Sequence, residues 1–526
     1  GAAMRHFWVP WVVALVGHIL IAGLGQAQTL TIALQREPTS MDPHYQASMP
    51  NMQLAMTLFD PLVRTNSQAV SEPALAHSWE VEGNQWTFYL RPNVHFSNGV
   101  LLTADDVLFS LSRPYKIQYS PSSYVVYLNQ IKELRRLDEH TIQITTHQPA
   151  PTLLADLAMI PIISQQTARK MAGANVYQAP LNPEALVGTG PFKLLSWQQG
   201  DAITLERNTH YWGAQVAWEQ VTFKPMTSGA DRVQALVTKQ VDLIEAPPID
   251  EIPHLEKMPT VFVQKKPSTR VMYIALNQAR AVPGGFQTAT ETNPLTDHRV
   301  RTALSLAIDR TYLARNVMNG AAVPAGNLLS HPAFGVSQEL AVAPALQFER
   351  ALELLHAAGY AQGFKVTLGA PVGLYQNDAG VAQAIADMWS LLGLEVEVLL
   401  ETPEIFFKLR DQYVFGSYLS AWNASSGEMS QSLKALAMTP DHHLGYGIMN
   451  WSHYSNAHLD QLVTQALQTL DADLRQHLLQ QAAQELIQDR VVIPILFELS
   501  TWAMRHGLRY EGRADQHTLP QYIYPL

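Results

Sequence analysis

The sequence contains no cysteine among its 526 residues. This absence excludes disulfide bridges, thiol nucleophiles and thiolate-bound metal ions in a single step. It does not identify a compartment. It does suit a chain that crosses a membrane unfolded and must then avoid mispaired disulfides under oxidising conditions.

Charge is also scarce, because Asp, Glu, Lys and Arg together make up only 15% of the residues and the formal net charge is -10. A surface that collects nucleic-acid phosphates needs an excess of basic residues, so nucleic acid is not expected as a partner. The catalytic patterns HExxH and GxSxG do not occur either, and no pair of acids shows a catalytic motif. The sequence therefore favours a binding protein over an enzyme.

Long hydrophobic runs are confined to the start of the chain. An apolar run covers residues 7–24, follows a short basic start and ends in a small-x-small triplet at residues 25–27. This pattern is typical of a secretory signal peptide, and the three residues before Met4 are interpreted as a cloning remnant. An uncleaved membrane anchor is the alternative, since the run nearly reaches bilayer length. Pro10 and Gly17 interrupt it, so we prefer the signal peptide and expect export to the periplasm.

The remaining sequence is long enough for more than one core, since a single hydrophobic core stops growing at roughly 250–300 residues. Apolar and polar residues alternate in short segments between amphipathic helical stretches. Strands are predicted at residues 29–34, 86–90, 141–145, 202–206, 261–264 and 365–368, and helices at residues 297–317, 348–358, 381–392 and 474–488. This mixture predicts an α/β fold with two or three lobes.

Turn and cap residues mark several of these elements. Asn98-Gly99 predicts a tight turn, and Thr103 is expected to cap a helix that carries Asp105 and Asp106 in its first turn. Gly188-Thr189-Gly190-Pro191 predicts another tight turn before a strand. It lacks the lysine and hydroxyl that follow the last glycine of a phosphate-binding loop, so we interpret it as part of the scaffold.

A long segment carries a family resemblance. Residues 72–113, EPALAHSWEVEGNQWTFYLRPNVHFSNGVLLTADDVLFSLSR, closely resemble the signature region of the family 5 extracellular solute-binding proteins, which include the oligopeptide-, dipeptide- and nickel-binding proteins of ABC importers. Further blocks follow the family's order across the chain: Ser40-Met41-Asp42-Pro43, GTGPFKLLSW and LERNTHYWG within residues 188–213, DHRVRTALSLAIDR at residues 297–310, and Tyr454-Ser455-Asn456 with Asp460 and Ile493-Pro494.

The resemblance implies a two-lobed periplasmic binding protein fold of type II, cluster C, with an extra subdomain in lobe one. Lobe one would comprise residues 28–59, 187–277 and 495–526, the subdomain residues 60–186, and lobe two residues 278–494. A small-molecule or peptide-like ligand would be held between the lobes, which close by a hinge motion. The transmembrane subunits of an ABC permease are the implied partners of a monomeric protein that needs no cofactor.

The ligand site departs from the peptide-binding relatives. There, a Trp in lobe two is followed three residues later by an Asp that pairs with the free α-amino group of the ligand. The matching stretch here is Trp422-Asn423-Ala424-Ser425, and a serine hydroxyl supplies no charge for a buried ammonium. A second acid near the start of the mature chain is missing too, since Tyr45 and its neighbours stand there. Both departures favour a neutral, blocked, anionic or otherwise modified ligand.

Five further positions are candidate ligand contacts with open alternatives. Glu428 either replaces the missing acid or is a solvated surface residue. Tyr273 and Asn277 lie on the segment that leads into lobe two, Trp389 on a helix of that lobe, and Arg410 before the Trp422 strand. Tyr273 and Trp389 can instead be core aromatics. Arg410 either holds a ligand carboxylate or is solvated.

Two other functions stay open. The ligand can be a metal chelate, such as a peptide-derived metallophore, which would need no metal ligands from the protein. The densest histidine group, Asp441-His442-His443, is a poor metal site, because adjacent side chains on an extended segment point to opposite faces. No protein-bound metal is therefore expected. A periplasmic hydrolase or chaperone that uses the same fold is the alternative from a different class.

Overall fold

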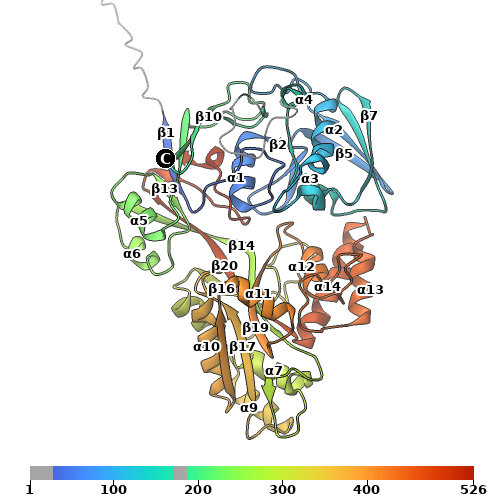
Figure 1. Cartoon of the computed structure of the whole chain (residues 1–526), viewed down its shortest axis with the longest axis vertical. Helices are drawn as coiled ribbons and strands as arrows, with labels where there is room; N and C mark the ends of the chain where they lie inside the picture. The colour runs from blue at the N-terminus through green and yellow to red at the C-terminus, as the bar shows by residue number, and fades with distance from the viewer. Residues whose placement is uncertain (1–27, 171–183, 185) are drawn as a thin grey trace, which may run out of the picture.

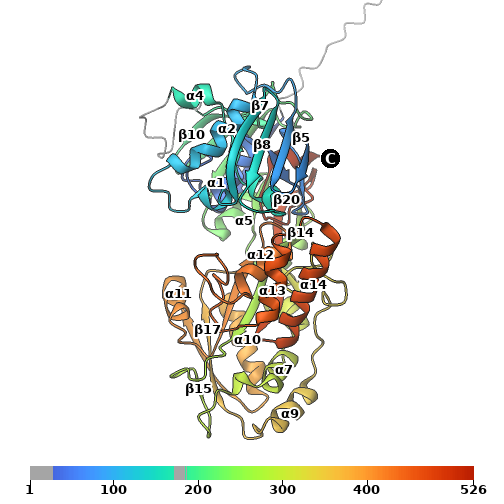
Figure 2. The same cartoon turned by 90° about the vertical axis from the view of Figure 1, so that its right-hand side faces the viewer.

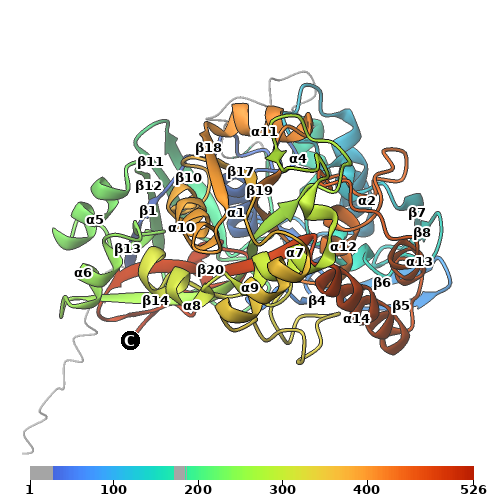
Figure 3. The same ribbon diagram turned by 90° about the horizontal axis from the view of Figure 1, so that it is seen from below.

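The computed structural model describes residues 28–170, 184 and 186–526; the predicted signal peptide lies outside this part of the chain. Two lobes lie one above the other, joined by the long strands β14 (Val261–Leu276) and β20 (Val492–Arg505) (Figure 1). These strands are antiparallel neighbours and run side by side across the molecule when it is seen from below (Figure 3). The result is a two-lobed α/β structure, as predicted.

Lobe one is built on one half of a sheet that continues into lobe two through β20 and β14. Its central strand β1 (Thr29–Leu34) pairs in parallel with a neighbour on each side. Both faces of the sheet are covered at β1, so the neighbouring residues Ile32 and Ala33 are both fully buried. The alternation in the sequence predicted buried residues on one face of this strand only. The other strands of this half are β10 (Phe192–Gln198), β11 (Ala202–Arg207), β12 (Gln220–Pro225) and β13 (Leu243–Glu245), and its helices include α1 (Met49–Leu58), α5 (Gly229–Val237) and α6 (Ile252–Glu256).

The extra subdomain has a separate four-stranded sheet and a core of its own. Its strands, in spatial order, are β5 (Ala76–Glu82), β6 (Gln85–Leu90), β8 (Thr141–Thr146) and β7 (Ile131–Asp138), with α2 (Ala104–Ser112) and α3 (Leu153–Leu157) beside them. Trp86, Phe88 and Leu90 are buried on one face of β6, which confirms the alternation read from the sequence. Thr103 caps the start of α2, also as predicted, and Asp106 completes a capping box with it.

Lobe two packs helices on both faces of the second half of the sheet. Figure 2 shows α12 (Met429–Leu436), α13 (Ala457–Ala466) and α14 (Ala472–Asp489) directly below the subdomain. The other elements of this lobe include β19 (Ser417–Asn423), β17 (Lys365–Pro371), β18 (Glu395–Glu401), β15 (Phe286–Gln287), β16 (Ala322–Pro324), α7 (His298–Leu306), α9 (Phe348–Ala357), α10 (Asp378–Ser390) and α11 (Pro403–Asp411).

The helix predicted over residues 297–317 is not continuous. α7 ends at Leu306, and a new short helix, α8 (Arg310–Tyr312), begins after it and runs on into a π-helical turn at Leu313–Val317. The break arises because Asp309 caps the second helix by accepting from the Tyr312 N–H at 3.0 Å. It also lets the buried Arg310 turn inward and donate to the Pro494 carbonyl at 3.0 Å.

Where the chain passes between the lobes, the ladder of β14 and β20 is interrupted. The register shifts between Pro267 and Val271, which is the geometry of a β-bulge. Ser268 Oγ bonds the Glu498 carbonyl at 2.5 Å, and Arg270 lies 3.6 Å from the buried Glu498 carboxylate. The crossing therefore has an irregular backbone held by polar side chains, which is a suitable place for a hinge.

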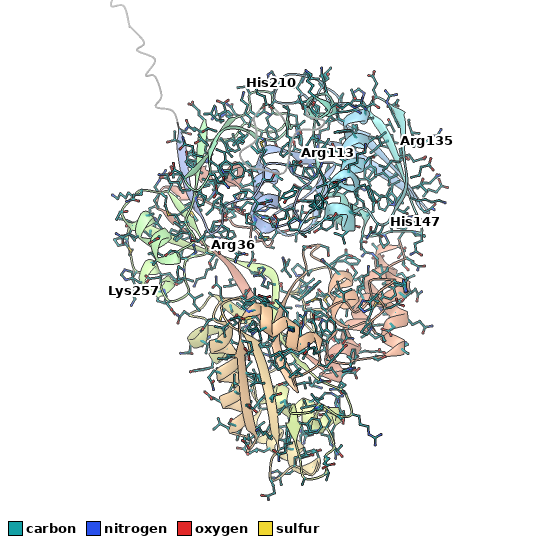
Figure 4. The ribbon with its side chains drawn as sticks, viewed as in Figure 1. Arg36, Arg113, Arg135, His147, His210 and Lys257 are labelled. Carbon is teal, nitrogen blue, oxygen red and sulfur yellow. The ribbon has the colours of Figure 1, made fainter. Side chains whose placement is uncertain are left out.

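The motif Ser40-Met41-Asp42-Pro43 has a structural role in attaching the subdomain to lobe one. Arg113 lies at the end of α2, and its two terminal guanidinium nitrogens donate hydrogen bonds of 2.7 and 2.6 Å to the fully buried Asp42 carboxylate. His44 accepts from the same guanidinium at 3.0 Å through Nδ1 and donates to the Pro161 carbonyl at 2.7 Å through Nε2. Figure 4 labels Arg113 inside the upper lobe.

This cluster predicts an acid-sensitive stability. Burial, and secondly the Arg113 charge, lower the pKa of His44 to about 4, whereas the unfolded chain binds the proton near pH 6.5. His44 should therefore contribute a fall of about 3 kcal/mol to the free energy of unfolding as the pH drops from about 6.5 to about 4, while Asp60 and Asp156, whose pKa values are raised by burial, act in the opposite direction over part of this range. Urea denaturation of the wild-type protein and of the His44→Gln variant isolates the His44 contribution, because the stability of the wild-type protein relative to the variant should fall by about 3 kcal/mol across this range.

Candidate functional site

Two adjoining cavities lie between the lobes. The large cavity, of about 730 Å³, has the subdomain on one side and the segment around Trp422 with α12 on the other. The small cavity, of about 280 Å³, is mostly lined by lobe one and the subdomain. Both include Thr65, Tyr127, Met159 and Ser425, so they form one continuous cleft. Its size suits a small organic ligand.

Three of the predicted site residues line this cleft. Trp422 lines the large cavity, Asn423 the small one, and Ser425 both. Asn423 Oδ1 accepts from Thr269 Oγ1 at 2.6 Å, which ties the loop after β19 to the crossing strand β14. Ser425 Oγ accepts from Gln431 Nε2 at 3.1 Å. This loop therefore has a fixed geometry at the point where the lobes face each other.

Gly427 shows how close the lobes come at this loop. Its φ is +72°, a left-handed conformation that favours glycine. A Cβ atom at this position would lie 2.4 Å from the carbonyl oxygen of Ala69 in the subdomain. The loop can approach the subdomain only because the residue is glycine.

Glu428 is paired inside lobe two. Its carboxylate accepts from Arg475 Nη1 at 2.6 Å and also from the Ser430 hydroxyl. Arg475 in turn stacks over the Phe334 ring at 4.0 Å. The structure thus gives Glu428 a partner within its own lobe, which is neither of the two roles considered from the sequence.

Three other candidates lie in the interior of lobe two. Trp389 is fully buried and donates its indole N–H to the Leu304 carbonyl at 3.0 Å, which corresponds to the core alternative. Tyr273 is 1% exposed on β14, and burial raises its pKa to about 12. Asn277 donates to the Phe415 carbonyl at 3.1 Å and accepts from the Ala279 N–H at 3.0 Å. Each packs or bonds within the lobe and is not among the described residues that line the cleft.

Arg410 and Tyr45 also have local contacts. The buried Arg410 pairs with the adjacent Asp411 at 2.9 Å and lies over the rings of Phe407 and Trp451. Tyr45 donates its N–H to the Asp42 carbonyl at 3.2 Å, and its carbonyl accepts from the Ser120 hydroxyl. Neither residue belongs to the described lining of the two cavities.

Sequence reasoning missed a row of methionines. Met49, Met52 and Met56 lie on one face of α1 and line the small cavity, at a spacing that a helix places on one side. Tyrosines complete the wall: Tyr124, Tyr127, Tyr211 and Tyr522. Flexible thioethers beside aromatic rings make an adaptable apolar surface. The spacing of the methionines was visible in the sequence, but it did not show that a cavity lies against that face.

One buried acid of the small cavity is held by neutral donors. Asp60 accepts from Trp212 Nε1 at 2.7 Å and from Thr189 Oγ1 at 2.8 Å. Burial raises its pKa to about 6, although both hydrogen bonds act in the opposite direction. Thr189 belongs to the turn at residues 188–191, so this turn positions an acid of the cleft as well as starting a strand.

Sequence reasoning also missed the two charged groups of the large cavity. Asp156, on α3 of the subdomain, accepts from Gln130 Nε2 at 2.5 Å. Lys434, on α12 of lobe two, lies on the opposite wall with its ammonium 6.0 Å from the centre of the Tyr446 ring. Neither position lies in a motif, so no signal in the sequence distinguishes them from other acids and lysines.

Three histidines line the large cavity as well. His147 comes from the subdomain, where Figure 4 shows it at the edge nearest lobe two, and His442 and His443 come from the facing loop. Within residues 28–170 and 186–526, no group of three His, Asp or Glu side chains is close enough to hold a metal ion. No helix in the same part of the chain has the length and hydrophobicity needed to span a membrane.

Comparison with known proteins identifies the family. The profile of the bacterial extracellular solute-binding proteins, family 5 (middle), matches residues 71–441, well over half of the chain. The chain belongs to this family. The periplasmic oligopeptide-binding protein OppA of Salmonella typhimurium is 27% identical over 507 residues, covering 90% of this chain and 88% of OppA. Heme-binding protein A of Haemophilus influenzae is also 27% identical, covering 78% and 76% of the two chains.

Solved structures agree with the fold. HbpA2 from Haemophilus parasuis superposes with a TM-score of 0.82 at 22% identity, covering 95% of this chain and all of that one. The two-lobed architecture predicted from the sequence is therefore confirmed. In this family 5 solute-binding protein, the cleft between the lobes, with Trp422, Asn423 and Ser425 in its lining, is the candidate ligand site.

Proposed function

We propose that this family 5 protein is the periplasmic substrate-binding subunit of an ABC importer. It captures a peptide-like or modified small organic ligand between its lobes as a monomer, closes about the crossing strands β14 and β20, and delivers the ligand unchanged to the transmembrane subunits of the permease. Relatives named as oligopeptide-binding and dipeptide-binding proteins support this type of ligand.

One observation carries the proposal: the cleft is lined from both lobes. Ser425 and Trp422 of lobe two face Thr65 and Tyr127 of the subdomain of lobe one around one continuous space. A ligand there contacts both halves only when they approach each other, so its binding free energy favours the closed arrangement. The lining combines aromatic rings, amides and hydroxyls, which suits recognition rather than bond-breaking.

Native mass spectrometry of the freshly purified protein tests the proposal. We expect a co-purified small molecule that leaves unchanged when the protein is denatured and that rebinds the emptied protein in one-to-one stoichiometry. Conversion of that molecule by the protein would instead support the hydrolase alternative. A molecule that contains a metal would support the metal-chelate alternative.

Trp422→Ala should reduce the affinity for the co-purified molecule by a factor of about ten to a hundred, because an aromatic anchor of the cleft is removed. Some stability is lost as well, since the half-buried ring packs on the lobe-two core and its N–H donates to Ser432 Oγ at 3.2 Å. Trp451→Ala is the matched control, because Trp451 packs on the same core but does not line either cavity. Equal losses of affinity in the two variants would contradict the assignment of Trp422 to the ligand site.

A further inference from the structure

The subdomain carries a hairpin whose tip meets the loop after β19. Its strands β3 (Val63–Thr65) and β4 (Ser71–Pro73) pair antiparallel. Asn66 Oδ1 accepts from the Val70 N–H at 3.0 Å, which closes the turn between them. Ala69 in this turn has a φ of +63°, a left-handed conformation that is uncommon for alanine. The hairpin tip is therefore a closed turn that presents backbone atoms to lobe two.

Lobe one holds this tip from the other side. Arg513, which is 2% exposed, donates to the Thr65 carbonyl at 2.8 Å. The next residue, Ala514, donates its N–H to the Ser67 carbonyl at 2.8 Å. The Arg513 guanidinium is itself fixed by its pair with Asp515 at 2.8 Å. Movement of the tip away from lobe two would break these buried hydrogen bonds, so the tip is a fixed surface.

The loop of lobe two that meets the tip is held equally well. Gln431 Nε2 donates to Ser425 Oγ at 3.1 Å, and Gln431 Oε1 accepts from the Ser426 N–H at 2.8 Å. The Gly427 N–H donates to the Ala424 carbonyl at 2.9 Å, which closes a turn. Gly427 therefore meets the hairpin tip from a loop whose own hydrogen bonds keep it in place.

Thr269 of β14 bonds both sides of this contact. Its N–H donates to the carbonyl of Ala514, the residue that holds the tip, at 3.1 Å. Its carbonyl accepts from the Ala424 N–H of the loop at 3.0 Å, and its hydroxyl donates to Asn423. Thr269 lies in the bulge where the register of β14 and β20 shifts. The two surfaces thus meet beside the hinge, where lobe two can turn without separating them.

From this arrangement we infer that Thr269, Ala69 and Gly427 form the pivot of lobe closure, through which the subdomain positions the ligand-lining loop at residues 422–425. The contact stays closed while the more distant parts of the lobes approach, so it fixes the separation of Ser425 from the subdomain. All three are positioning residues, since they lie outside the described lining of both cavities. The inference rests on the proposed function, because a pivot serves a protein whose lobes close.

Gly427→Ala tests the pivot in a chain that has no cysteine of its own. Nitroxide labels at Arg135→Cys in the subdomain and Gln461→Cys on α13 report the distance between the lobes by pulsed electron spin resonance of the emptied protein. Both positions are exposed outside the cavities, and Figure 4 shows Arg135 at the outer edge of the subdomain. A Cβ atom 2.4 Å from the Ala69 oxygen must force the surfaces apart. The mean distance between the labels should therefore increase by about 2 Å, because packed elements transmit such strain.

Gly445→Ala is the matched control. Gly445 has a φ of +70°, close to the +72° of Gly427, and it lies in another loop of lobe two that lines the cleft. A Cβ atom there would come no closer than 4.0 Å to Lys434. Both variants thus place alanine in a left-handed conformation, but only Gly427→Ala meets the subdomain. If Gly427→Ala lengthens the label distance no more than Gly445→Ala does, the loop relaxes within lobe two and the inference is overturned.

Thr269→Val decides the question if Gly427→Ala does not fold. The change keeps both backbone bonds of residue 269 and removes the hydroxyl that holds Asn423, so the label distances should spread over a wider range about an unchanged mean. Thr302→Val is its control, because the Thr302 hydroxyl bonds the His298 carbonyl at 2.8 Å on α7, outside both cavities. A distribution as narrow in Thr269→Val as in Thr302→Val would overturn the inference.

These measurements separate the pivot from the proposed function. If Gly427→Ala moves the lobes but native mass spectrometry of the wild-type protein finds no bound small molecule, the contact positions the lobes and capture of a ligand is wrong. If a small molecule binds and leaves unchanged but neither variant alters the label distances, capture stands and the pivot is wrong.

Discussion

Gly190→Ala is expected to lower the free energy of unfolding by about 3 kcal/mol or more. A Cβ atom at this position would lie 2.4 Å from the Leu58 carbonyl carbon and 2.6 Å from the Phe59 nitrogen, at the end of α1. Real Cβ atoms do not approach backbone so closely, and the Gly190 N–H already bonds the Leu58 carbonyl at 3.1 Å. The substitution must therefore push the turn and the end of α1 apart.

Gly83→Ala is the matched control, because a Cβ atom at Gly83 would meet nothing within 4 Å. Its positive φ of 59° should still cost about 1 kcal/mol in the alanine variant. Chemical denaturation of both variants measures the difference. A loss at Gly190 no larger than the loss at Gly83 would show that the turn relaxes freely. A larger loss should be accompanied by weaker ligand binding, since the methionine face of α1 lines the small cavity.

The comparison with the sequence explains why glycine is needed at residue 190. The GTGP segment predicted a tight turn, but the φ of Gly190 is not positive. Glycine is needed there because the end of α1 packs so closely against the turn that a side chain has no room. Such a contact joins residues far apart in the chain, which local patterns cannot show. The strands at residues 86–90 and 202–206 were predictable for the opposite reason, because alternation with a period of two is a local property.

The lining of the cleft was predictable only where a motif carried it. The resemblance located Trp422, Asn423 and Ser425, and these residues line the cleft. It could not locate Asp156 or Lys434, because which side chains line a cavity between two lobes depends on how the lobes face each other rather than on neighbouring residues. Trp389 and Tyr273 were candidate ligand contacts and instead lie in the core. The sequence could not separate these two outcomes, because an aromatic residue on a core-facing helix or strand has the same sequence pattern whether or not it reaches a cavity.

Arg113→Met is expected to lower the free energy of unfolding by about 3–5 kcal/mol at about pH 8. The substitution leaves the Asp42 carboxylate, which has no exposed surface, without the two guanidinium contacts of 2.7 and 2.6 Å that compensate its burial. The remaining N–H bond from His44 at 2.9 Å does not supply a charge. Since Arg113 lies at the end of α2 and Asp42 in lobe one, the variant should loosen the subdomain from the lobe.

The pH dependence of this variant distinguishes loss of the ion pair from general loss of packing. The Arg113 charge contributes to the lowered pKa of His44, and Asp42 acts on that pKa in the opposite direction. Without Arg113, His44 should take up a proton more readily and replace the missing cation, so the deficit should be smaller at about pH 5 than at about pH 8. The double variant Asp42→Asn/Arg113→Met should lose less than the sum of the two single changes. A deficit that is independent of pH would mean that Arg113 acts through its packing alone, and a loss below about 1 kcal/mol would show that solvent reaches the pair.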